Sequence, residues 1–246
     1  MKPPRTRPII AMPGRFSRSA SALRYEAVVN ARALLQAVYD AGGDPVTVLP
    51  TPLDPDDPAG DIAGRLAGFD GVLMPGGADV DPHLYGQEAD GHTDPADAVQ
   101  DEFDLAVLRH AVDTALPLMT VCRGTQLLNV MLGGTLEQDM ARPHQHTIVS
   151  LELPAHSDLT ARLGSADLDV PTTMNVSCYH HQRIAELATG LTAIATSDDG
   201  TVEAVRAPDL PGWVLGVQWH PEDTAVGDVY QRRLLETFIA ACRAAA

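Results

Sequence analysis

The sequence predicts an α/β protein whose first half alternates strands and helices and whose second half adds antiparallel strands. Two observations support this fold class. As far as about Leu136, short apolar runs alternate with amphipathic segments, which is typical of buried parallel strands joined by crossover helices. After Leu136 the segments are rich in Thr and Val and alternate in polarity, which is typical of antiparallel strands.

The elements of the first half follow from these runs. Four are expected to be parallel strands, because each has four or five residues and ends at Gly, Pro or Cys: 8–12, 45–49, 71–74 and 117–121. Apolar residues at helical spacing predict helices over 24–41, 101–115 and 126–132. The segment 50–58 is rich in Asp and Pro and is expected to be a loop.

The second half is expected to contain five strands, at 147–153, 171–177, 191–196, 201–207 and 213–219, and to close with a helix over 225–245. No internal repeat and no Gly/Ser linker divides the chain. Residues 1–246 are therefore expected to form a single domain.

Composition argues against several classes of protein. The chain has 246 residues with 17 Lys and Arg against 33 Asp and Glu, a formal net charge of −16, which disfavours a nucleic-acid partner. Three cysteines are an odd number in a long chain and favour a reducing compartment over a disulfide framework. The apolar run 9–12 is too short for a signal peptide or a membrane span, so we expect a cytoplasmic protein without a membrane partner.

The positive charge is concentrated at the start of the chain. The first 32 residues hold seven of the 17 cations and a single acid, Glu26. This segment is either a basic terminus exposed to solvent or a basic surface that recognises anions.

Cys122 stands between the apolar run 117–121 and the predicted helix 126–132. A nucleophile at a strand-to-helix turn projects from the carboxyl edge of the sheet, where the helix N-terminus favours the thiolate and offers N–H groups to an oxyanion. The alternative is a small core residue.

Two further segments favour the catalytic interpretation. The strand 213–219 is followed by His220, Pro221 and Glu222. His220 is therefore a candidate base and Glu222 its orienting carboxylate. Taken alone, the two residues are equally consistent with a structural histidine and a surface acid. Gly76 and Gly77 directly follow the run 71–74, where glycines let backbone N–H groups approach a ligand, or simply form a tight turn. No phosphate-loop signature is present there, which disfavours ATP and NAD.

Four blocks carry a family resemblance: LMPGGADVDPHLYG at 73–86, VCRGTQLLNVMLGGTLEQD at 121–139, YHHQ at 179–182 and GVQWHPE at 216–222. The chain resembles the class I glutamine amidotransferase-like family of peptidase C26 type, and within it the free-standing gamma-glutamyl-gamma-aminobutyrate hydrolases. The resemblance implies a doubly wound, flavodoxin-like mixed sheet flanked by helices, with the site at its carboxyl edge.

The same resemblance implies roles for individual residues. Cys122 would be the nucleophile, His220 the general acid and base, and Glu222 its partner, which completes a catalytic triad. The backbone N–H groups of Gly77 and Arg123 would form the oxyanion hole. Three residues would lie near the substrate: Gly76, Gln126 and His180.

No metal and no cofactor is expected. Six other histidines form no zinc pattern with cysteine in the sequence: His83, His92, His110, His144, His146 and His156. The chain also departs from the family pattern, with Thr120 where a Gly is usual and Ser177-Cys178 where Asn-Ser is usual. Thr120 is expected to crowd the nucleophile turn. Cys178 is either a buried inert thiol or a second redox-active one.

The expected activity is that of a cysteine-dependent gamma-glutamyl hydrolase, which releases glutamate from a small-amine conjugate. An acidic surface favours a cationic leaving group, as in polyamine catabolism, whereas Arg15, Arg18 and Arg24 favour an anionic one such as gamma-aminobutyrate. The alternatives are a glutaminase subunit that supplies ammonia to a separate synthetase and a catalytically impaired binding protein. A homodimer is a family-level expectation.

Overall fold

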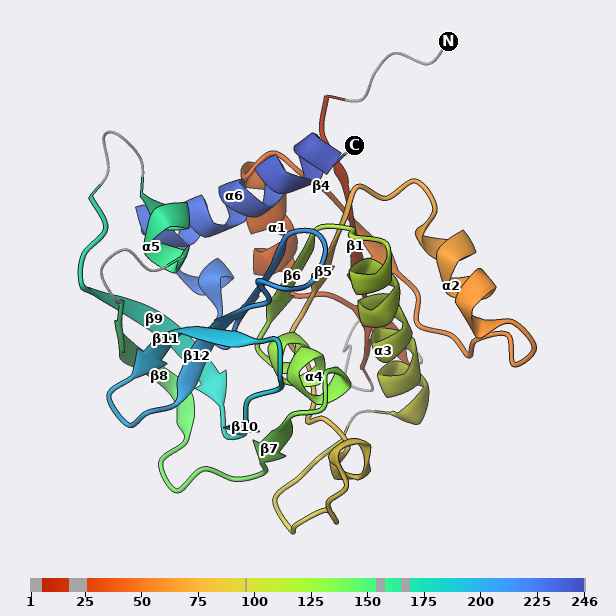
Figure 1. The fold of residues 1–246 in the computed structure, drawn as a ribbon, viewed down its shortest axis with the longest axis horizontal. Helices are drawn as coiled ribbons and strands as arrows, with labels where there is room; N and C mark the ends of the chain where they lie inside the picture. The colour runs from red at the N-terminus through yellow and green to blue at the C-terminus, as the bar shows by residue number, and fades with distance from the viewer. Residues whose placement is uncertain (1–5, 18–25, 96, 154–157, 165–168, 246) are drawn as a thin grey trace.

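A nine-stranded mixed sheet forms the centre of the structure (Figure 1), with strand order β4-β1-β5-β6-β13-β12-β11-β8-β9. The computed structural model describes residues 6–17, 26–95, 97–153, 158–164 and 169–245. The α/β class with an antiparallel C-terminal portion is confirmed.

The parallel half of the sheet contains β1 (Ile9–Pro13), β4 (Asp44–Val48), β5 (Gly71–Met74) and β6 (Leu118–Val121), close to the predicted runs. Strand β13 (Val214–Val217) pairs parallel with β6 and antiparallel with β12, so it joins the two halves of the sheet. Strands β5, β6 and β13 are buried along their whole length, which explains their unbroken apolar sequences.

The antiparallel half contains β12 (Val202–Arg206), β11 (Thr192–Ser197), β8 (His144–Glu152) and β9 (Thr173–His180). This half curls back on the sheet, because the N–H of His220, just beyond β13, donates to the carbonyl of Ser177 in β9 at 2.8 Å. The curl brings the last strand of the sheet beside the end of a central one.

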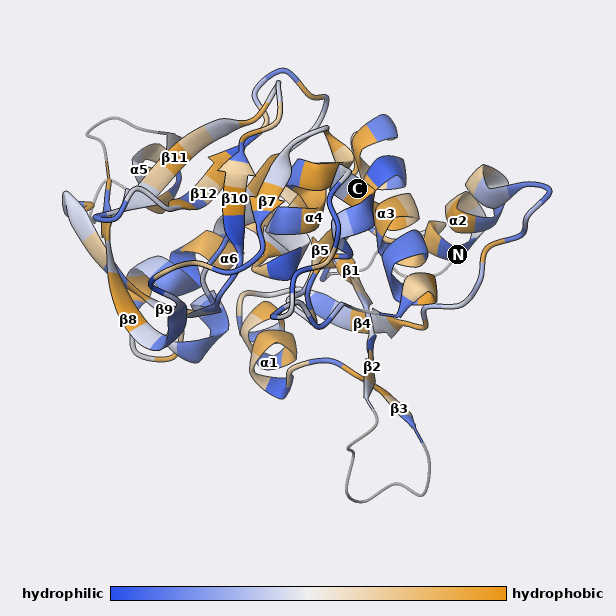
Figure 2. Ribbon diagram, turned by 90° about the horizontal axis from the view of Figure 1, so that it is seen from below, coloured by the Kyte–Doolittle hydropathy of each residue, from blue (hydrophilic) through white to orange (hydrophobic). Residues whose placement is uncertain are grey.

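Helices cover both faces, as the doubly wound arrangement requires. One core contains Leu34 of α1 (Arg32–Asp40) and Phe238 of α6 (Val229–Ala245), and it also includes residues of α5 (Asp158–Leu163). The other contains residues of α2 (Pro58–Leu66), α3 (Ala98–Asp113) and α4 (Arg123–Met131). Helix α1 carries both apolar and hydrophilic positions (Figure 2), as expected for a helix with one buried side.

The predicted helix 24–41 is wrong in its first part. The helix begins at Arg32, and Ala27–Val29 forms β3, which pairs with β2 (Arg15–Ser17) as a hairpin. The adjacent β-branched residues Val28 and Val29 favour the strand, and this preference prevails over the helical spacing. Arg24 lies outside the described residues.

Other elements were not predicted. Helix α2 begins where the expected loop ends, with Asp57 as its N-cap and Pro58 at its first position, a start signal that the Asp- and Pro-rich composition obscured. A small sheet pairs β7 (Thr135–Glu137) with β10 (Arg183–Glu186), and 3-10 turns form at Pro82–Tyr85 and Pro221–Asp223. No described helix combines the length and apolar character needed to cross a bilayer.

Candidate active site

Three neighbouring parallel strands end at one edge of the sheet, and each is followed by residues singled out in the sequence. Gly76 and Gly77 follow β5, Cys122 follows β6, and His220 follows β13. Because β6 pairs with both β5 and β13, their carboxyl ends meet here. This edge is where open α/β sheets bind ligands.

Cys122 adopts a strained backbone conformation. Its φ of 50° and ψ of −113° place it in a region that non-glycine residues rarely occupy, which costs about 1 to 3 kcal/mol. Its N–H donates to the Val217 carbonyl at 2.8 Å, and α4 starts at the next residue. Its Sγ lies 4.0 Å from the Tyr179 carbonyl oxygen. The turn therefore fixes the thiol at the N-terminus of α4.

His220 and Glu222 form a close pair. Nδ1 of His220 lies 2.8 Å from Oε1 of Glu222, because Pro221 begins a 3-10 turn that folds the carboxylate back onto the ring. Burial lowers the pKa of His220, but contacts with Cys122 and Glu222 outweigh it and raise the pKa to about 11. This arrangement keeps the His220 imidazole protonated beside the Cys122 sulfur at neutral pH.

Gly76 fits between these groups because it has no side chain. A Cβ on Gly76 would lie 3.1 Å from Cε1 of His220 and 3.5 Å from Cβ of Cys122. Any side chain here would press on the imidazole. The sequence-predicted residues Gly76, Cys122, His220 and Glu222 are thus brought together.

Arg15 holds the glycine loop in place. Its guanidinium donates from Nε to the Gly76 carbonyl at 2.7 Å and from Nη2 to the Pro75 carbonyl at 2.6 Å. The peptide between Gly76 and Gly77 is trans, so fixing the Gly76 carbonyl toward Arg15 directs the Gly77 N–H the opposite way. The N–H of Arg123, in the first turn of α4, has no partner within its helix. The expected oxyanion hole at these two amides stays a prediction.

A buried ion network continues behind this loop. Asp104 of α3 accepts from Arg15 at 2.9 Å and from Arg123 at 2.6 Å, and Arg123 also contacts Asp101. Burial lowers the pKa of Arg15 to about 10 and raises that of Asp101, so Arg15 stays charged at neutral pH. Sequence reasoning missed this network; the only signal was the pair of acids three residues apart on α3.

The network changes the interpretation of the basic N-terminal segment. Arg15 was expected at a basic surface that recognises anions, but its donors are used by Asp104 and two backbone carbonyls. Arg18 and Arg24 lie outside the described residues.

Gln126 and His180 lie close together through a shared backbone carbonyl. Both are buried, and both approach the Gln182 carbonyl: Nε2 of Gln126 at 3.1 Å and Nδ1 of His180 at 2.9 Å. The structure therefore brings these two residues together. Their expected contact with the substrate stays a prediction.

Thr120 finds room beside the nucleophile turn. Its hydroxyl lies 2.9 Å from that of Thr125, which donates to the Val217 carbonyl, and the side chain packs against Gly216 of β13. The expected crowding is relieved by this glycine. Burial and the nearby Glu203 raise the pKa of the Cys178 thiol, which favours the inert interpretation over the redox-active one.

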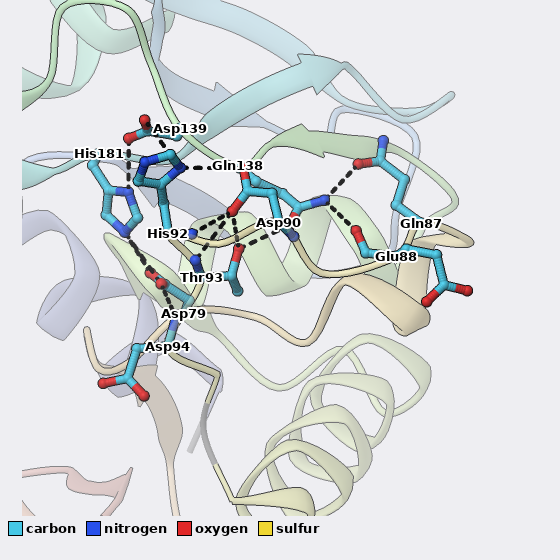
Figure 3. A network of polar contacts seen from close by, with 10 residues as sticks. All are labelled: Asp79, Gln87, Glu88, Asp90, His92, Thr93, Asp94, Gln138, Asp139 and His181. Carbon is cyan, nitrogen blue, oxygen red and sulfur yellow. Dashed lines mark hydrogen bonds and ion pairs between the residues drawn. The ribbon is translucent and has the colours of Figure 1, made fainter.

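A polar network rich in acidic residues surrounds His181, the neighbour of His180 in the sequence (Figure 3). His181, from the YHHQ block, lies 3.1 Å from Asp79, which follows the glycine loop, and 3.3 Å from Asp139. Three further acids belong to the same polar network: Glu88, Asp90 and Asp94. We call these five acids the acidic flank.

This geometry defines a class: an α/β protein with a cysteine on a strained strand-to-helix turn, paired with a histidine and a glutamate from the neighbouring strand. Residues 8–222 match the model of the peptidase C26 family, and the chain belongs to that family. The resemblance seen in the sequence is confirmed. Such a chain is an enzyme of hydrolase or amidotransferase type.

Individual proteins agree with this assignment. A protein of Lactococcus lactis subsp. lactis named YvdE, provisionally termed glutamine amidotransferase-like, is 36% identical over 206 residues, covering 82% of this chain and 84% of its own. Gamma-glutamyl-gamma-aminobutyrate hydrolase PuuD of Escherichia coli K12 is 33% identical over 221 residues, covering 85% and 84%. A crystal structure of a Thermoplasma acidophilum protein, provisionally termed a component of GMP synthase, shares the fold with a TM-score of 0.65 at 17% identity, covering 97% and 95%.

The His220 pair makes a prediction about thiol reactivity. Because the raised pKa keeps His220 protonated at neutral pH beside the sulfur, alkylation of wild-type Cys122 by iodoacetamide at pH 7 is expected to be faster than in a variant that lacks this imidazole. In His220→Asn the rate should fall at neutral pH and rise toward an ordinary thiol pKa of about 8.5. Alkylation of the Cys122→Ala variant measures the background from the two other thiols, Cys178 and Cys242, which are buried. Matching pH profiles in wild type and His220→Asn would contradict the pairing.

Arg15 makes a second prediction. Arg15→Lys keeps a charge near Asp104 but cannot donate to both loop carbonyls, so kcat should fall about tenfold to a hundredfold with little change in KM, since losing an oxyanion donor outright costs about 10² to 10³. Alkylation of Cys122, which forms no oxyanion, should be unchanged.

Arg7 provides a matched control for this experiment. It pairs with Asp44 and donates to the Gly43 carbonyl at 2.6 Å, but at the opposite end of β1. Arg7→Lys should leave kcat unchanged. An equal loss in both variants, or unchanged kcat in a folded Arg15→Lys, would refute a positioning role for Arg15.

Proposed function

We propose that this protein is a free-standing gamma-glutamyl hydrolase that cleaves the gamma-glutamyl amide of a small amine and releases glutamate. The observation that carries the proposal is Cys122 on its strained turn beside the His220–Glu222 pair. The similarity to PuuD, named for hydrolysis of gamma-glutamyl-gamma-aminobutyrate, supports the substrate class.

The residues divide the reaction into two steps. The Cys122 thiolate attacks the gamma-carbonyl carbon, and the N–H groups of Gly77 and Arg123 stabilise the oxyanion that forms. The amide C–N bond breaks as the His220 imidazolium gives its proton to the departing amine, leaving a gamma-glutamyl thioester on Cys122.

Water then completes the cycle. Neutral His220 takes a proton from a water molecule, whose oxygen attacks the thioester carbonyl, and the C–S bond breaks to release glutamate and the Cys122 thiolate. Glu222 keeps the imidazole in the orientation that both steps need, through the 2.8 Å contact with Nδ1.

Charge around the site favours a cationic leaving group. The acidic flank begins at Asp79, two residues after Gly77 of the glycine loop. In the contacts drawn in Figure 3, the only side chains near these carboxylates that can carry a positive charge are imidazoles. Of the three arginines expected to favour an anion, Arg15 is the one that the structure describes, and it is paired with Asp104. We therefore propose that polyamine conjugates are hydrolysed faster than the gamma-aminobutyrate conjugate.

A substrate panel tests both parts of the proposal. Glutamate release is measured from gamma-glutamyl-polyamines, gamma-glutamyl-gamma-aminobutyrate and glutamine, for wild type and Cys122→Ala. We expect turnover that Cys122→Ala abolishes, with kcat/KM highest for the polyamine conjugates and falling with added salt, because salt screens the flank.

Other outcomes separate the alternatives. Preference for the aminobutyrate conjugate would overturn the charge argument but keep the hydrolase. Turnover of glutamine alone would favour an ammonia-supplying glutaminase. Binding without turnover, in a protein whose Cys122 still alkylates, would indicate a binding protein.

A further inference from the structure

A second cluster of chemically reactive side chains lies inside the curled antiparallel portion of the sheet (Figure 1). It contains His144 of β8, Cys178 and His180 of β9, and Glu203 of β12. All four are buried, with exposed fractions of 8%, 1%, 4% and 0%, and one ligand atom from each lies within 4.8 Å of the others. The proposed hydrolysis gives none of them a chemical step.

The backbone is bent to assemble this cluster. His144 and His180 are cross-strand partners in the β8–β9 ladder, but the register shifts between His144 and Thr147. The shift includes His146, whose φ of 51° is in the left-handed region that disfavours a side chain. A bulge of this kind re-aims a side chain, and here it places His144 opposite His180.

His180 is oriented as a metal ligand would be. Its Nδ1 lies 2.9 Å from the Gln182 carbonyl, which can only accept, so Nδ1 carries the proton. In the neutral ring Nε2 then presents its lone pair. This buried atom makes no hydrogen bond among the described residues, although it lies 3.4 Å from Oε1 of Glu203. Metal-bound imidazoles commonly donate their second N–H to a carbonyl in this way.

His144 shows the related arrangement with a carboxylate. Its Nε2 lies 3.2 Å from Asp199, and its Nδ1 lies 2.9 Å from Oε1 of Glu203, inside the cluster. A carboxylate behind a histidine fixes the tautomer that leaves the other nitrogen for the metal. Asp199 therefore belongs outside the ligand set, as an orienting group.

From these positions we infer that His144, Cys178, His180 and Glu203 bind one divalent metal ion, and that the donor set fits Zn²⁺. Two imidazole nitrogens, one thiolate and one carboxylate are ligands that zinc accepts in tetrahedral sites. Because four protein ligands close the coordination shell, the site is structural. It ties together β8, β12 and β9, and β9 is the strand whose Tyr179 carbonyl contacts Cys122.

The geometry requires a modest contraction. Ligand atoms about 2.0 to 2.3 Å from a tetrahedral ion lie about 3.3 to 3.6 Å apart. Sγ of Cys178 already lies 3.8 Å from Oε2 of Glu203. On binding, the Cys178 thiol releases its proton to solvent, since a coordinated thiol is deprotonated.

The competing explanation is a hydrogen-bonded network alone. Hydrogen bonding to Glu203 raises the pKa of His144, so a proton on His144 bridges Glu203 and Asp199 without any metal. The two explanations differ in what happens to Cys178: a network needs only its weak S–H contact, whereas a metal site needs its thiolate.

Cobalt binding tests the site in the full chain. The Cys122→Ala variant is used so that the Cys122–His220 pair cannot bind the ion, and hydrolysis plays no part in the readout. We expect one equivalent of Co²⁺ per chain with a thiolate-to-cobalt charge-transfer band. We also expect Zn²⁺ at a hundredfold excess over Kd to raise Tm by about 5 to 10 °C.

Matched variants locate the ion. In the Cys122→Ala background, Cys178→Ser should remove the band, whereas Cys242→Ser, at a buried thiol of helix α6 that packs beside Gly71 of β5, should keep it. Absence of both the band and the Tm shift in Cys122→Ala would overturn the proposal, whether or not Cys178→Ser folds. So would a band that survives Cys178→Ser.

Discussion

The parallel pairing of β6 with β5 on one side and β13 on the other is the constraint on which the site depends. Residues 118–120 of β6 pair with residues of β5, and the whole strand pairs with β13, so the residues that follow each strand meet at one edge. A shift of one residue in either ladder would turn alternate side chains to the opposite face of the sheet. Cys122, the glycine loop and His220 are therefore brought together by the backbone hydrogen bonds of the sheet.

The sequence predicts most of this frame because its signals are local. Runs of four buried residues have no polar alternation, and the Cys122 turn and the His220–Glu222 pair are each contained within a few residues. The remaining features depend on long-range contacts: Arg15 meets Asp104 across 89 positions, and His144 meets Glu203 across 59. No spacing rule identifies such pairs. The start of α1 was misplaced for a different reason, since β-branched residues fit both a helical apolar face and a short hairpin.

Two buried polar clusters lie close to Cys122 and the glycine loop, and they differ in how their charges are compensated. In the network behind the glycine loop, two guanidinium groups face two carboxylates with direct contacts, so the charges balance within the protein. In the curled portion, the two carboxylates lie against imidazoles: His144 contacts both Asp199 and Glu203, and His180 lies 3.4 Å from Glu203. Buried ion pairs add little net stability compared with apolar packing, so their value here lies in fixing one geometry.

The position of β13 also has a consequence for synthesis of the chain. This strand inserts between β6 and β12, yet it comes near the end of the sequence, long after Cys122. A chain growing on the ribosome therefore contains Cys122 before the imidazole that is proposed to work with it. Until β13 is made and inserted, Cys122 lacks its neighbours His220 and Glu222, so under the proposed mechanism a prematurely terminated chain cannot cleave amides.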